Sequence, residues 1–65
     1  MTTAELYLEH ARKLLDQAVR AGEAARHAAA LGCFLLARHA VEERDRLLEQ
    51  AAHFESMAHK LAERP

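Results

Sequence analysis

Apolar residues in this sequence recur every three or four positions, which is the spacing of one face of an α-helix. Starting at Ala4, the spacing keeps its phase for about nine helical turns. The stripe contains Ala4, Tyr7, Ala11, Leu14, Ala18, Ala21, Ala25, Ala28, Gly32 and Leu35, with a neighbouring seam at Leu8, Leu15, Gly22, Ala29 and Leu36. A chain of 65 residues has too little surface elsewhere to cover so long a stripe by folding on itself.

The residue composition favours helices and excludes strands. The chain has 15 Ala and 10 Leu, with no Ile, Asn or Trp. Its β-branched residues are only Thr2, Thr3, Val19 and Val41. Ala and Leu are among the strongest helix formers, whereas strands are rich in β-branched and aromatic side chains. We therefore expect an all-α fold with a single helical domain over residues 1–65.

The first helix has a clear start signal. Thr2 followed by Glu5 three residues later is a capping box, in which each side chain satisfies a backbone N–H group of the other residue. Opposite charges four residues apart support the solvated face of the helices. These pairs are Glu9–Lys13, Asp16–Arg20 and Glu42–Arg46.

Three positions compete for the turn between helices. Gly22 and Gly32 could each follow a helix C-terminus as a capping glycine. The third candidate lies at Ala40–Glu43, where the apolar phase of the first stripe is lost. A single turn gives a helical hairpin and two turns give a short three-helix bundle. We favour a turn at 40–43, and we expect either form to complete a larger bundle by dimerisation.

The stretch from residue 18 to residue 32 is mostly Ala and Gly, so it needs a partner surface with larger side chains. The candidates for that surface are Leu35, Leu36, Leu47, Leu48, Phe54, Met57 and Leu61. The last helix has its own apolar stripe at Leu47, Ala51, Phe54, Ala58 and Leu61.

The C-terminal half resembles a pattern of many small uncharacterised bacterial helical proteins. The residues that carry it are Leu36-Ala37, Arg44-Asp45-Arg46-Leu47-Leu48 and Ala51-Ala52-His53-Phe54-Glu55-Ser56-Met57-Ala58. Ala40-Val41-Glu42 stands where that pattern often has Asp-Pro-Glu. The resemblance implies two helices packed about a turn, and it implies no activity.

The charge balance argues against nucleic-acid and membrane partners. Nine Lys and Arg against ten Asp and Glu give a net charge of −1, whereas nucleic-acid binders usually carry a basic surplus. The longest uncharged apolar run, Ala28 to Ala37, is too short to span a bilayer. A lone Cys33 and a start without a signal-peptide pattern lead us to expect a cytoplasmic protein.

Neither the histidines nor the cysteine form a recognisable site in the sequence. The five histidines are His10, His27, His39, His53 and His59, and no two stand three or four residues apart, the spacing of paired helical metal ligands. Cys33 lies among apolar neighbours, which favours a small core side chain over a nucleophile. We expect no metal and no cofactor.

Two sequence pairs, Arg20–His27 and Arg46–His53, resemble the Arg-x4–6-His signature of the HEPN ribonucleases. That resemblance implies an RNA-cleaving pair on one helix face. HEPN domains are substantially longer than this chain, and Tyr7, Phe34 and Phe54 are better explained as core residues than as a platform for stacked bases. We therefore do not expect an enzyme.

The leading hypothesis is a non-enzymatic interaction module that associates with itself as a homodimer or larger oligomer. The alternatives are a regulator or antitoxin-like protein that orders on a different partner and, less favoured, a HEPN-like nuclease or metal-binding protein. The expected interface residues are Leu8, Leu15, Ala18, Ala25, Ala29, Leu36, Leu47, Phe54 and Leu61.

Overall fold

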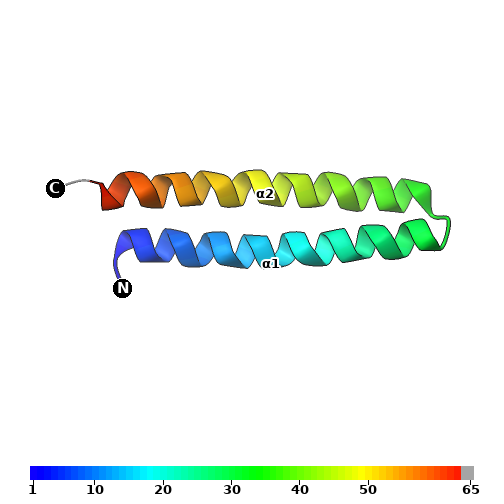
Figure 1. Ribbon diagram of the computed structural model, residues 1–65, viewed down its shortest axis with the longest axis horizontal. Coiled ribbons are helices and arrows are strands. Elements are labelled where there is room, and N and C mark those ends of the chain that lie inside the picture. Colours follow the sequence, from blue (N-terminus) through cyan, green and yellow to red (C-terminus); the bar gives the residue numbers. More distant parts are fainter. Residues whose placement is uncertain (64–65) are drawn as a thin grey trace.

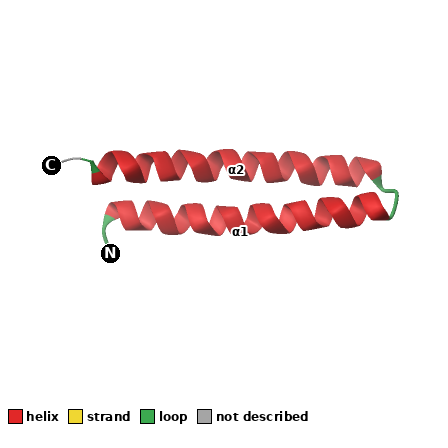
Figure 2. Ribbon diagram, in the orientation of Figure 1, coloured by secondary structure: helices red, strands yellow, loops and turns green. Residues whose placement is uncertain are grey.

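The chain forms an antiparallel helical hairpin in a computed structural model that describes residues 1–63. Helix α1 spans Thr3–Ala30 and helix α2 spans Phe34–Ala62. The two helices lie side by side along their whole length, so the first and last described residues are at the same end of a rod (Figure 1). Its Cα extents are 53 × 16 × 9 Å. Figure 2 shows that a short connection at the far end is the only non-helical segment between them.

Helix α1 begins at the predicted cap. The Glu5 backbone N–H donates a hydrogen bond to Thr2 Oγ1 at 3.1 Å, as the capping box requires. The reciprocal contact differs from the prediction, because the Thr2 hydroxyl donates to Glu5 Oε1 at 3.1 Å. The Glu5 carboxylate also lies at the positive end of the helix dipole, which stabilises the first turn.

The turn is closed by a Schellman motif centred on Gly32. The Cys33 N–H donates to the Ala28 carbonyl at 2.8 Å, and the Gly32 N–H donates to the Ala29 carbonyl at 3.0 Å. Gly32 has φ of 79°, a left-handed conformation that is unfavourable for residues with a Cβ atom. The first helical bond of α2, from the Ala37 N–H to the Cys33 carbonyl, follows directly.

The favoured turn at Ala40–Glu43 is wrong, because α2 continues through these residues without a break. This segment has no glycine, proline or asparagine to end a helix. The acidic residues there are accommodated by ion pairs on the helix surface, Arg38–Glu42 at 3.4 Å and Arg46–Glu43 at 3.1 Å. The two-turn alternative fails for the same reason, so the part of the chain that the structure describes contains two helices and no third.

The contact between the helices is made mainly by alanine. The buried residues are Ala11, Leu14, Ala18, Ala25, Leu47, Ala51 and Ala58. Leu14 and Leu47 are the only large side chains among them, and Ala21 and the half-buried Phe54 pack against the cluster. Small side chains let the helix axes approach closely, but each one removes little apolar area from water.

Several residues that we expected in the core are on the surface. Phe34 is 73% exposed, and Cys33 is also exposed. Leu35 and Leu36 are also exposed, so they do not cover the small residues of α1 as we expected. With the turn at 31–33 rather than at 40–43, these residues begin α2 at the end of the rod, opposite the small alanine side chains that end α1. Of the expected aromatic core, Tyr7 and Phe54 are half-buried.

The two glycines differ in a way that unfolding experiments can measure. For Gly32→Ala we expect the free energy of unfolding to fall by about 1–2 kcal/mol, because the left-handed conformation places a Cβ too close to the following carbonyl oxygen. No heavy atom lies within 4 Å of the added Cβ, so that cost belongs to the backbone.

Gly22→Ala is the matched comparison, because it makes the same change inside α1. An added Cβ there meets only Arg44 Cδ, at 3.5 Å, which is an ordinary contact. The higher helix propensity of Ala should raise the free energy of unfolding by roughly 1 kcal/mol. Urea titrations of both variants at one protein concentration check the pair, and equal shifts in the same direction would contradict this account of the turn.

Candidate functional site: an apolar face along the hairpin

A shallow groove of about 580 Å³ lies along one face of the hairpin, between the two helices. The residues that line it are Leu15, Ala18, Val19, Gly22, Glu23, Ala25, Arg26, Ala29, Ala37, Arg38, Val41, Arg44 and Leu48. We call this surface the groove face. Its lining is mostly apolar, and several of its larger apolar residues are accessible, since Val19 is 61% exposed and Leu48 42% exposed.

The groove face arises from seven-residue spacing on both helices. Leu8, Leu15, Gly22 and Ala29 follow one another at this interval on α1, which places them on the flank of the buried stripe. Val41 and Leu48 do the same on α2. Because these flanks adjoin across an antiparallel pair, Leu15, Gly22 and Ala29 line the same groove as Val41 and Leu48. The small side chains between them leave the surface hollow.

Arg44 brings a charge into the middle of this surface. It occupies the position in α2 where the buried stripe would have an apolar residue, and it is only half-buried. Its aliphatic stem lies beside Gly22, where the missing side chain makes room for it. The guanidinium contacts Asp45 Oδ1 at 3.1 Å, and both groups are well exposed, so this pair adds little to stability.

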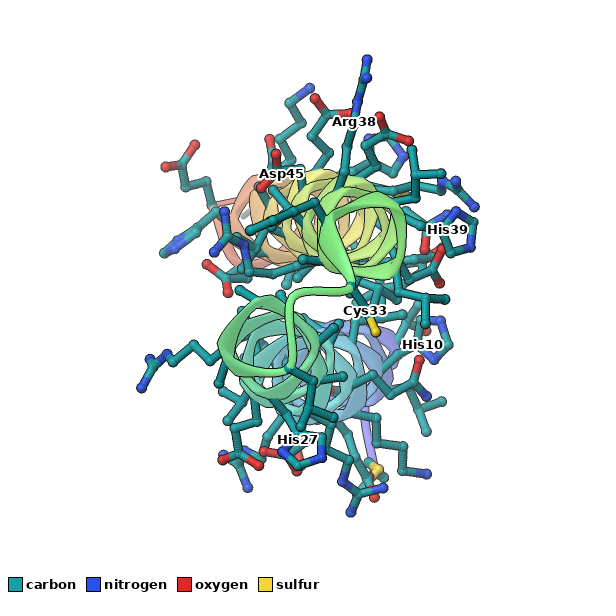
Figure 3. The ribbon with its side chains drawn as sticks, turned by 90° about the vertical axis from the view of Figure 1, so that its right-hand side faces the viewer. His10, His27, Cys33, Arg38, His39 and Asp45 are labelled. Atoms are coloured by element: carbon teal, nitrogen blue, oxygen red, sulfur yellow. The ribbon has the colours of Figure 1, made fainter. Side chains whose placement is uncertain are left out.

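The other side of the hairpin carries both polar and apolar residues. A small depression there is lined by His10, Glu49, Gln50, His53 and Phe54. Phe54 packs edge-on against both histidines, with ring centroids 4.6 Å from His10 and 5.8 Å from His53, and is stacked with Tyr7 at 5.8 Å. Viewed along the rod from the turn, His10 and Asp45 lie on opposite sides of the hairpin (Figure 3).

The structure divides the expected interface residues into three groups. Leu8, Leu15, Ala29 and Leu36 are exposed. Phe54 and Leu61 are half-buried. Ala18, Ala25 and Leu47 are buried between the two helices of one chain, although Ala18 and Ala25 also form the floor of the groove face. Of the exposed group, Leu15 and Ala29 line the groove face and Leu8 and Leu36 lie outside it, whereas Leu47 belongs to the internal contact.

Sequence reasoning missed much of the α2 side of this face. Leu48 was expected to cover the small residues of α1, and neither Val41 nor Phe34 was predicted to lie on the same side of α2 as Leu48. Their seven-residue spacing is visible in the sequence, but it has meaning only once α2 is known to begin at Phe34. Val19 was also missed, because it stands alone beside the seam of α1.

The residues considered for chemistry remain apart or exposed. Among residues 1–63, no three His, Cys, Asp or Glu side chains are close enough to hold a common metal ion. The HEPN-like pairs, Arg20–His27 and Arg46–His53, are all exposed, and Arg46 is engaged by Glu43 at 3.1 Å. None of these groups lines the groove face.

Comparison of the chain with models of protein families, with curated proteins and with solved structures finds no match. Within the described residues, neither helix combines the length and the apolar character needed to cross a bilayer.

Glutamate substitutions at Ala25 and Ala29 should distinguish a residue buried between the two helices from an exposed residue of the groove face. Ala25 is 7% exposed, so Ala25→Glu puts a carboxylate between the helices, and we expect loss of most helicity at 25 °C. Ala29 is exposed, and Ala29→Glu should leave the hairpin folded.

Circular dichroism at 222 nm during thermal unfolding measures both variants at the same protein concentration. If Ala25→Glu melts like the unmodified chain, then Ala25 does not lie in the helix–helix contact. If Ala29→Glu is unfolded, the surface around Ala29 is essential to the single hairpin.

Proposed function

We propose that this chain is a non-enzymatic self-association module, and that two copies pair through their groove faces to form a four-helix bundle. The observation that carries the proposal is the mostly apolar groove on one face of the hairpin, where Val19 and Leu48 are exposed. Facing apolar surfaces of this kind form the cores of four-helix bundles.

The small apolar area buried between α1 and α2 favours association of the hairpin with a second chain. Five of the seven buried residues are alanines, so the two helices bury little apolar area against each other. Chains of this size usually need a disulfide, a metal or an oligomer interface to supplement their core. Cys33 is the only cysteine, so no disulfide can form within the chain. A second hairpin laid on the groove face would supply the missing apolar contact.

The groove face carries charges of both signs, which a second copy could pair across an interface. The lining of the groove carries three basic residues, Arg26, Arg38 and Arg44, and one acidic residue, Glu23. Glu23 adjoins Gly22, which lies beside Arg44, so acidic and basic groups occur at the same level of the rod. In a two-fold dimer whose axis passes near this level, each Glu23 lies close to the basic groups of the partner, and each interface contact occurs twice.

A carboxylate at Leu48 should break the dimer. Leu48 lines the groove face, and Leu48→Glu would bury two carboxylates in a symmetric interface. We expect the dissociation constant to rise by at least about 100-fold, measured by sedimentation equilibrium over a range of concentrations. The unmodified chain should sediment with twice the mass of one chain.

Leu6→Glu is the matched control. Leu6 is 54% exposed and stands on α1 about half a turn around the helix from Leu8, away from the groove face. This variant should keep the dimer mass. Equal weakening by both substitutions would contradict an interface at the groove face.

Sedimentation equilibrium of the unmodified chain also tests whether a second copy of the chain occupies the groove face. A stably folded single chain at the highest concentration would overturn the proposal, since no second copy would then be needed. A chain that is partly unfolded alone and gains helicity only with a different protein would replace the homodimer by a heterologous complex.

A further inference from the structure

Four large apolar side chains crowd the turn end of the rod, away from the groove contacts just described. Their exposed fractions are 67% for Leu31, 73% for Phe34, 83% for Leu35 and 64% for Leu36. Together with the intervening Gly32 and Cys33 they form the segment that we call the tip. No other stretch of the described chain gathers large hydrophobic residues at such exposure.

The tip is convex, and its apolar groups point in several directions. Phe34, Leu35 and Leu36 are consecutive in α2, so they project about 100° apart and together cover more than half of the helix circumference. Leu31 follows the end of the other helix. A flat protein surface or a groove would contact one side of this end and leave the rest in water. A fluid apolar phase contacts all four side chains at once.

The tip is surrounded by basic groups and lacks acidic ones. From residue 24 to residue 41 the chain contains Arg26, His27, Arg38 and His39 but no Asp or Glu. Viewed from the turn, His27, Arg38 and His39 extend outward in three different directions (Figure 3). The nearest carboxylate in contact with this group is Glu42, whose pair with Arg38 is well exposed on both sides and therefore weak.

The N–H groups of the turn are paired within the chain, which lowers the cost of moving the turn out of water. The Leu31, Gly32 and Cys33 N–H groups all donate to carbonyls of the last turn of α1. Unpaired backbone groups are what usually keep a turn out of an apolar phase. The first turn of α2 differs, because the Cys33 side chain makes no capping hydrogen bond to it. The free N–H groups of this turn should therefore lie among the polar headgroups of a bilayer and not in its acyl interior.

We propose that the tip inserts into the surface of an anionic lipid bilayer, with its apolar side chains at the boundary of the acyl chains and its basic groups among the headgroups. Our expectation that the chain has no membrane partner rested on the length of the apolar run and the mixed charge of the helices. Neither argument applies to the end of a hairpin. The apolar part of the inference does not depend on the proposed dimer, because none of the four apolar side chains of the tip lines the groove face, whereas Arg26 and Arg38 do.

The apolar part of the proposal is tested with Leu35→Glu. Leu35 is the most exposed of the four, and Glu in the first turn of α2 favours the helix dipole, so this variant should fold as well as the unmodified chain. In cosedimentation with phosphatidylcholine vesicles containing phosphatidylserine, we expect its partition coefficient to fall at least tenfold. Leu6→Glu, at the other end of the rod, should bind like the unmodified chain.

The electrostatic part is tested with the double variant Arg26→Gln and Arg38→Gln. Because both residues also line the groove face, the mass of this variant is measured without lipid, and the vesicle result counts only if that mass is unchanged. A basic residue near an anionic surface contributes about a fivefold gain in binding, so the pair should cost roughly 25-fold on vesicles with phosphatidylserine. Binding to pure phosphatidylcholine vesicles should be weak and unchanged. Arg12→Gln with Arg20→Gln removes the same charge from exposed positions away from the tip and should have a smaller effect.

Three results would overturn the inference. The first is that the unmodified chain fails to bind vesicles of either composition. The second is that Leu35→Glu and Leu6→Glu reduce binding equally, which would indicate nonspecific adsorption. The third is that Leu35→Glu leaves vesicle binding intact but halves the sedimenting mass, which would make the tip a contact between protein chains. Sedimentation equilibrium of Leu35→Glu without lipid separates this last result from failure of the groove-face dimer.

Discussion

The alanine-rich contact between α1 and α2 is the constraint on which the rest of this structure depends. Small side chains at Ala11, Ala18, Ala51 and Ala58 allow two long helices to lie against each other over the full length of the rod. The same small side chains bury little apolar area per residue, so the contact holds the helices in register without using most of their large hydrophobic groups. Those groups remain on the surface, where they give the hairpin its two distinct apolar regions.

These two regions differ in shape, and the difference determines what each can contact. The groove face is long and slightly hollow, with Leu15, Val41 and Leu48 on its sides and charges of both signs within it. We propose that such a surface pairs with another pair of helices. The tip is convex and surrounded by basic groups, and its side chains diverge around the start of α2. A soft, anionic phase suits that end better than a second rigid surface does.

Much of the local structure could be predicted from the sequence, because it depends on neighbours within one helical turn. The helical content, the cap at Thr2 and the buried stripe through Ala11, Leu14 and Ala18 follow from residue type and spacing. The position of the turn did not follow, because Gly22, Gly32 and the loss of phase near residue 42 are each compatible with a helix end. Because the turn was predicted about ten residues too late, Phe34, Leu35 and Leu36 were expected in the core, whereas they are exposed.

The sequence by itself determined that the chain is helical and that its apolar surface is larger than its own core needs, since both properties follow from composition and periodicity. Only the tertiary structure decided which apolar residues are covered. Closure at Gly32 pairs each position of α1 with one position of α2, and this pairing places Gly22 beside Arg44 and leaves Val41 and Leu48 on the groove face. The physical reason is that burial depends on the partner helix, which is tens of residues away along the chain.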